Sequence, residues 1–129
     1  MNSKPAPSAY RDHELLSASP GQLVVITYDA LLASLTRARV GCSMNSFEVT
    51  LPAIERARAL LAELLGSLDR ERGGALAMQL ASIYAFLLGE LQGMGTHPDA
   101  ARLDRHVRMV SELREAFATV ASPARANVA

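Results

Sequence analysis

The sequence predicts an all-α protein, an antiparallel up-down-up-down four-helix bundle with an N-terminal arm. The good helix formers Ala and Leu recur throughout, whereas only three Tyr and three Phe occur and Trp is absent. Apolar residues repeat in four segments at the 3.6-residue helical period, and Pro, Gly and capping residues separate these segments. Because the connections are fairly short, neighbouring helices are expected to be antiparallel.

Three parts of the chain are expected: an arm over residues 1–18, a helical bundle over 19–120 and a disordered tail over 121–129. The arm is rich in Pro at first and then holds Tyr10, Leu15 and Leu16, which are too apolar to stay fully solvated. It is therefore expected to pack on the bundle. The tail contains Pro123 and has no helical period.

The first helix is expected to start at Ser19, as N-cap, with Pro20 in its first position. Its apolar residues follow two neighbouring stripes, so it should bury two faces. Gly41 is expected to close it, and residues 42–50 to form a loop. The next helix is expected to begin near Pro52, because a helix tolerates Pro only in its first turn.

The second helix has one apolar face, formed by Ala57, Leu60, Leu61, Leu64, Leu65 and Leu68. Residues 69–74 are expected to form a short polar hinge, and a third helix then runs to about Gln92. Between Gly73 and Gln92 the only charged residue is Glu90, so this helix should have little solvent-facing surface.

The fourth helix is expected after Gly93 and Gly95, with Thr96 or His97 as cap and Pro98 in its first position. One side of this helix is apolar and the other is charged, so it should lie half in the core and half in water. Its apolar stripe consists of Leu103, Val107, Val110, Leu113 and Phe117.

Charge and hydropathy argue against nucleic acid and membranes as partners. Lys plus Arg equals Asp plus Glu at 13 each, so no basic field is available for phosphates. Residues 1–10 lack the apolar centre of a signal peptide, and no uncharged apolar run has the length and density of a membrane span. A cytoplasmic location is expected, in keeping with the single free thiol of Cys42.

No catalytic centre, metal or cofactor is expected. A bundle-type metal site needs Glu-x-x-His, but the residues three before His13, His97 and His106 are Tyr10, Met94 and Leu103. His106 suggests a histidine phosphotransfer domain as one alternative function, although its position on the apolar stripe favours a satisfied histidine at the core boundary. A self-associating structural bundle is the other alternative.

Three blocks of the sequence resemble the FliS family of flagellar secretion chaperones. The first holds Tyr10, Leu16-Ser17-Ala18-Ser19-Pro20-Gly21-Gln22-Leu23 and Thr27-Tyr28-Asp29-Ala30-Leu31; the second holds Ser67-Leu68-Asp69, Gly73-Gly74, Leu80, Ile83-Tyr84 and Phe86. The third is Leu113-Arg114-Glu115-Ala116-Phe117, where the family often has Trp in place of Phe. The blocks follow the family's order and spacing over about residues 10 to 120.

The resemblance implies a non-enzymatic export chaperone that binds the C-terminal segment of flagellin and prevents its premature polymerisation. It also implies that the arm around Tyr10 covers a groove until the client arrives. Apolar first and third helices suit binding of a partner helix in a groove, although core packing is the competing interpretation for each leucine. The predicted client-binding residues are Tyr10, Leu23, Ile26, Tyr28, Leu31, Leu80, Tyr84 and Leu87.

Overall fold

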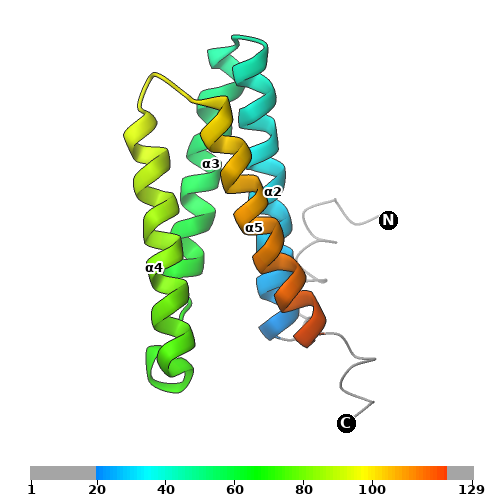
Figure 1. The fold of residues 1–129 in the computed structure, drawn as a ribbon, viewed down its shortest axis with the longest axis vertical. Coiled ribbons are helices and arrows are strands. Elements are labelled where there is room, and N and C mark those ends of the chain that lie inside the picture. The colour runs from blue at the N-terminus through cyan, green and yellow to red at the C-terminus, as the bar shows by residue number, and fades with distance from the viewer. Residues whose placement is uncertain (1–19, 122–129) are drawn as a thin grey trace, which may run out of the picture.

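The computed structural model describes residues 20–121, which form four α-helices joined by short turns. These are α2 (Pro20–Ser43), α3 (Phe47–Gly66), α4 (Arg70–Met94) and α5 (Ala100–Ala121). Successive helices run in opposite directions (Figure 1). The all-α prediction is confirmed. The predicted arm, the N-cap at Ser19 and residues 122–129 of the predicted tail lie outside the described residues.

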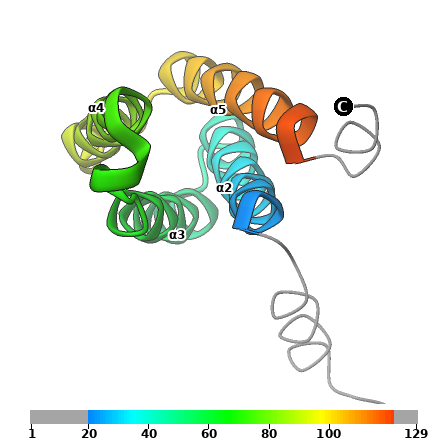
Figure 2. The ribbon, with the colours of Figure 1, turned by 90° about the horizontal axis from the view of Figure 1, so that it is seen from below.

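Helix α2 holds the bundle together. It packs against both α3 and α5, as the two predicted stripes require, and α3 also packs against α4. Seen along the bundle, α4 lies beside α3, whereas α5 lies next to α2 (Figure 2). Burial of apolar side chains from all four helices is the main stabilising contribution. The largest buried members of this core are Tyr28, Leu31, Leu35, Leu61, Tyr84, Leu87, Leu91, Leu103 and Val110.

Gly41 does not end α2, which continues to Ser43. A Cβ built at Gly41 would overlap the hydroxyl oxygen of Thr50 and lie 3.1 Å from a methyl carbon of Val49. The glycine therefore serves the close approach of α3 to α2 and is not a helix terminator.

Helix α3 begins five residues before the predicted start at Pro52. Ser46 is the N-cap, and its hydroxyl accepts a hydrogen bond from the backbone N–H of Val49 at 3.3 Å. Pro52 lies inside the helix, where it removes one backbone hydrogen bond. The rule that restricts Pro to the first turn was too strict here, because the cap at Ser46 and the packing of Thr50 and Ala53 in the interior hold this end of the helix.

The predicted polar hinge before the third helix is helical for one turn and then kinked. The Asp69 carboxylate accepts a hydrogen bond from the backbone N–H of Arg72 at 3.0 Å, which caps this turn. Gly74 has φ 53° and ψ −130°, a conformation that favours glycine and breaks the helical path. Helix α4 then extends to Met94, beyond the predicted Gln92, and Gly95 ends it with φ 53°.

Asp99 caps α5, in place of the predicted Thr96 or His97. Its carboxylate accepts hydrogen bonds from the backbone N–H groups of Ala101 and Arg102, at 3.0 and 3.2 Å. A carboxylate suits this position because it satisfies free N–H groups and lies at the positive end of the helix dipole.

Candidate functional site

An apolar pocket of about 320 Å³ lies at the end of the bundle where α2 begins and α5 ends. All four helices contribute to it, and the start of α4 forms one side. Polar groups are confined to a few residues near the α3–α4 turn, including Asp69 and Arg72. The apolar lining consists mainly of Val24, Leu64, Leu68, Leu76, Leu80, Tyr84 and Phe117.

The outer face of α4 carries an uncharged strip of exposed residues. We define the α4 strip as Met78, Ser82, Ala85, Phe86, Gly89 and Gly93, which recur every three or four residues and are all exposed. Met78 is 66% exposed and Phe86 is 52% exposed. A Cβ added at Gly89 or Gly93 would meet no atom within 4 Å. The strip thus combines two large apolar side chains with small residues that allow another helix to approach closely.

Helix α4 is strongly apolar, and part of its apolar surface is open to solvent. By length and composition alone this helix is apolar enough to cross a membrane, yet only 28% of its most apolar stretch is buried. A core helix meets the same criterion, and α4 does bury one side against the bundle through Leu80, Tyr84, Leu87 and Leu91. The prediction that this helix has little solvent-facing surface is wrong, because its outer side is open.

Tyr28 and Tyr84 join α2 to α4 in the core. Their hydroxyl oxygens are 2.5 Å apart, and the rings meet edge to face with centroids 6.4 Å apart. The Tyr28 ring also meets Phe117 of α5 edge to face at 5.5 Å. Burial raises the pKa of both tyrosines, and for Tyr28 the hydrogen bond with Tyr84 raises it further. The pair therefore stays neutral at physiological pH.

His106 joins α5 to α4 and is 2% exposed. Its Nε2 lies 3.5 Å from a carboxylate oxygen of Glu90, and Arg102 contacts the same oxygen at 3.6 Å. Burial lowers the pKa of His106, although Glu90 opposes this. The Nδ1 atom has no hydrogen-bond partner. The predicted position of His106 near the core is confirmed. Only one of its two ring nitrogens, Nε2, has a partner. Phosphotransfer would need an exposed imidazole, and this one is buried.

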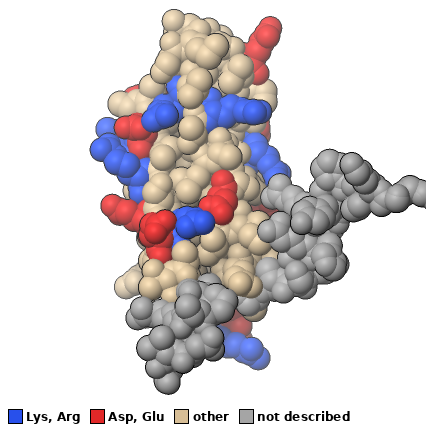
Figure 3. Space-filling model, turned by 90° about the vertical axis from the view of Figure 1, so that its right-hand side faces the viewer, with Lys and Arg blue, Asp and Glu red and all other residues tan. Residues whose placement is uncertain are grey.

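The face formed by α2 and α5 carries charges of both signs (Figure 3). Arg39 of α2 pairs with Asp104 of α5 at 3.0 Å, and Arg114 of α5 pairs with Asp29 of α2 at 2.7 Å. Exposed pairs of this kind contribute little to stability, because water screens the attraction between the charges. Their mixed signs also make this face unlike the uncharged α4 strip.

The structure places the predicted client-binding residues in two different environments. Tyr28, Leu31 and Leu87 are fully buried, and Leu80 and Tyr84 are buried beside the apolar pocket. Leu23 and Ile26, near the start of α2, are half-buried. Tyr10 lies outside the described residues. A role for these residues in client binding stays a prediction, and for Tyr28, Leu31 and Leu87 it would require the bundle to open.

The client-binding residues predicted from the sequence did not include Met78 and Phe86 of the α4 strip, or Val24 and Phe117 of the apolar pocket. Met78 and Phe86 lie off the main stripe of α4, and this position was the available signal that they face outward. Val24 and Phe117 line the pocket but are distant in sequence from its α3 and α4 walls. The sequence contained no signal that Val24 and Phe117 meet those walls in one pocket.

Other chemistry is sparse in residues 20–121. Within this range no group of three or more His, Cys, Asp or Glu residues is arranged to hold a metal ion. The thiol of Cys42 is half-buried, and burial raises its pKa, although a hydrogen bond with Thr50 opposes the rise. A raised pKa disfavours the nucleophilic thiolate.

The fold and the exposed apolar surface define a small helical binding protein. Its sequence matches the family model described as flagellar protein FliS over residues 2–124. It is similar to the flagellar secretion chaperones FliS of Campylobacter jejuni subsp. jejuni, at 26% identity over 93% of this chain and 94% of the relative, and of Salmonella typhimurium, at 26% over 85% and 82%. The Vibrio cholerae chaperone is 22% identical over 82% of this chain and 78% of the relative. The chain belongs to the FliS family of chaperones for flagellar secretion.

Proposed function

We propose that this chaperone binds the C-terminal segment of flagellin in the cytoplasm and prevents that segment from polymerising before export. The observation that carries the proposal is the α4 strip, a helix face that is exposed and uncharged. Exposed apolar surfaces of this kind mark sites of protein interaction.

The strip suits a partner that is itself an amphipathic helix. Its members recur at helical spacing, so a helix lying along α4 would contact Met78, Ala85 and Phe86 in turn. Ser82 and Gly89 leave room for its backbone to come close. Such a complex would remove the apolar side of the client from water and from other flagellin molecules. The chaperone would therefore act by occupying the client, without chemical change.

The apolar pocket extends the proposed site at the first turns of α4. Leu76 lines the pocket and is itself 57% exposed, so the pocket and the outer side of α4 meet at this residue. An apolar side chain of the client could enter between Leu76 and Phe117. The predicted residues Leu80 and Tyr84 lie at the back of the same pocket.

Titration calorimetry with the host's flagellin tests the proposal. Full-length flagellin should bind, and flagellin without its C-terminal segment should not. If neither form binds, the proposal is wrong, and sedimentation of the free protein would then test the self-associating bundle as the alternative.

A matched pair of variants locates the site. Ala85→Glu places a charge in the α4 strip and should weaken flagellin binding more than tenfold, because the carboxylate must be desolvated without a partner. Ala59→Glu makes the same change at an exposed position of α3 and should leave binding unchanged. Equal affinities for the two variants would exclude the α4 strip as the binding surface.

A further inference from the structure

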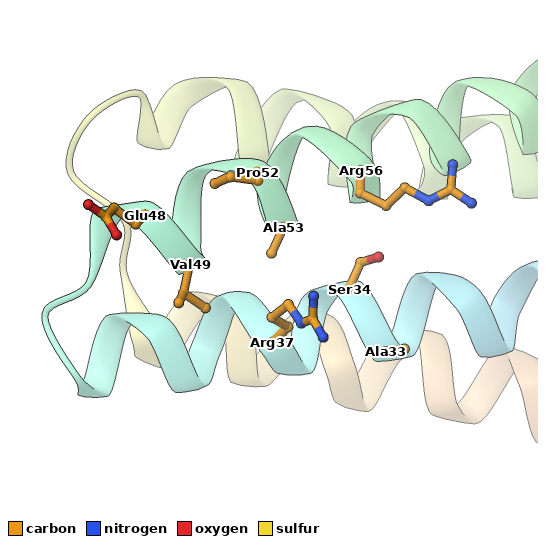
Figure 4. Close-up of a pocket in the computed structure, with 8 residues that line it drawn as sticks. All are labelled: Ala33, Ser34, Arg37, Glu48, Val49, Pro52, Ala53 and Arg56. Carbon is orange, nitrogen blue, oxygen red and sulfur yellow. The ribbon is translucent and has the colours of Figure 1, made fainter.

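A second groove lies between α2 and α3, near the turn that joins them. It has a volume of about 630 Å³ and is open to solvent along one side of the bundle. Ser34 and Arg37 of α2 form one wall, and Val49, Pro52 and Arg56 of α3 form the other (Figure 4). The groove shares no lining residue with the apolar pocket beside Phe117.

Four of the residues that line the groove are small, namely Ala33, Ser34, Pro52 and Ala53, and they leave space between the two helices. Arg37 of α2 lies opposite Pro52 and Ala53 of α3, and Ser34 lies opposite Arg56 (Figure 4). The helices nevertheless stay close at their shared end, where Gly41 contacts Thr50. The packing of the two helices therefore sets the shape of the groove, and its lining is both apolar and charged.

Two arginines in the groove lack carboxylate partners. Three or four residues before and after Arg37 stand Ala, Ser, Val and Gly, and around Arg56 stand Pro, Ala, Ala and Leu. In the part of the chain that the structure describes, neither guanidinium makes an ion pair, whereas Arg39, Arg58 and Arg114 each do. The groove lining contains one carboxylate, that of Glu48, so two positive charges face one negative charge.

We propose that this groove binds an acidic segment of a partner protein, at a site separate from the α4 strip. Two carboxylates of the segment pair with Arg37 and Arg56, whose planar guanidinium groups suit bidentate contact with a carboxylate. A small apolar side chain between them rests on Val49 and Pro52. Nucleic acid fits less well, because Glu48 would repel its phosphates and the chain has a formal net charge of zero.

Fluorescence anisotropy with two labelled peptides tests the charge requirement. The probes are a repeating Glu-Glu-Leu peptide and its Lys-Lys-Leu counterpart. The chaperone should bind the acidic peptide and not the basic one, and binding should weaken as salt screens the charges. Absence of acidic-peptide binding at low salt, or equal binding of both peptides, would overturn the proposal.

Variants then locate the binding. Arg37→Ala and Arg56→Ala should each weaken acidic-peptide binding roughly three- to fivefold, and the double variant more than tenfold. Ala33→Leu keeps both charges but fills the groove, and should also weaken binding. Arg105→Ala, at an exposed position of α5, is the matched control and should bind as the native protein does. An equal loss in Arg105→Ala would show that only net charge matters and would refute the site.

Flagellin affinity distinguishes this inference from the proposed function. The Arg37 and Arg56 variants should bind flagellin with unchanged affinity, because the α4 strip lies on another helix. If flagellin binding falls in parallel with acidic-peptide binding, the groove belongs to the flagellin site and the proposal of a separate site is wrong.

Discussion

The hydroxyl pair of Tyr28 and Tyr84 provides a direct test of the core. Both side chains are buried, and their hydroxyl oxygens, 2.5 Å apart, satisfy each other. Tyr84→Phe removes one hydroxyl and leaves that of Tyr28 buried without this partner. Leaving a buried hydroxyl without a hydrogen-bond partner costs about 1–3 kcal/mol. We expect Tyr28→Phe to cost a similar amount for the same reason.

The double variant separates the pair from general packing. Replacing both tyrosines by Phe removes both hydroxyls, keeps the rings and should cost about 1 kcal/mol or less. The two single changes would then sum to at least about 2 kcal/mol, and the double change would be less destabilising than their sum. Urea unfolding followed by far-UV circular dichroism measures all four proteins. Additive losses would refute the reasoning, because they would mean that the hydroxyls do not satisfy each other.

Three further predictions concern stability. Since burial lowers the pKa of His106, the unfolded chain binds a proton more readily, and the free energy of unfolding should fall as the pH drops below about 6.5. His106→Gln should flatten this pH dependence, as measured by urea unfolding at several pH values. An unchanged pH dependence in the variant would show that other groups cause it. Gly41→Ala should destabilise the protein by about 1–3 kcal/mol, because the new Cβ overlaps Thr50. Gly66→Ala, with no atom near its Cβ, should stabilise it by about 0.5–1 kcal/mol. Equal shifts of the melting temperature in the two variants would contradict this pair of predictions. Leu61→Ala should cost about 2–5 kcal/mol in urea unfolding by leaving a cavity, and a loss below about 1 kcal/mol would show that the site collapses.

The helix boundaries show where local sequence rules succeeded and where they failed. Gly95 is one of the two glycines that were expected to end the third helix, and it does so, because its backbone has a left-handed φ that glycine adopts readily. Gly41 was misread because the same residue type also serves close helix packing, which has no local signature. The start of α3 was misplaced for a related reason: Ser46 caps the helix six residues before Pro52, and the helix tolerates the proline inside.

The candidate site was only partly visible in the sequence. Periodicity identified Tyr28, Leu80 and Tyr84 as apolar-stripe residues, but the pairing of the two tyrosine hydroxyls depends on the relative height of α2 and α4. Met78 and Phe86 lie away from the main apolar stripe of α4, and both are exposed. This exposure arises because α4 packs against α3 and leaves its outer side open.

The sequence by itself determined four amphipathic helices, their approximate ends and membership of a chaperone family, because periodicity, capping residues and ordered motifs are local properties. Only the tertiary structure decided which apolar faces are covered. Helices α2 and α4 are both rich in apolar residues, but α2 lies between two neighbours and buries two sides, whereas α4 keeps one side exposed. Composition sets how apolar a face is, but its burial depends on the position of the neighbouring helices, which the local pattern does not encode.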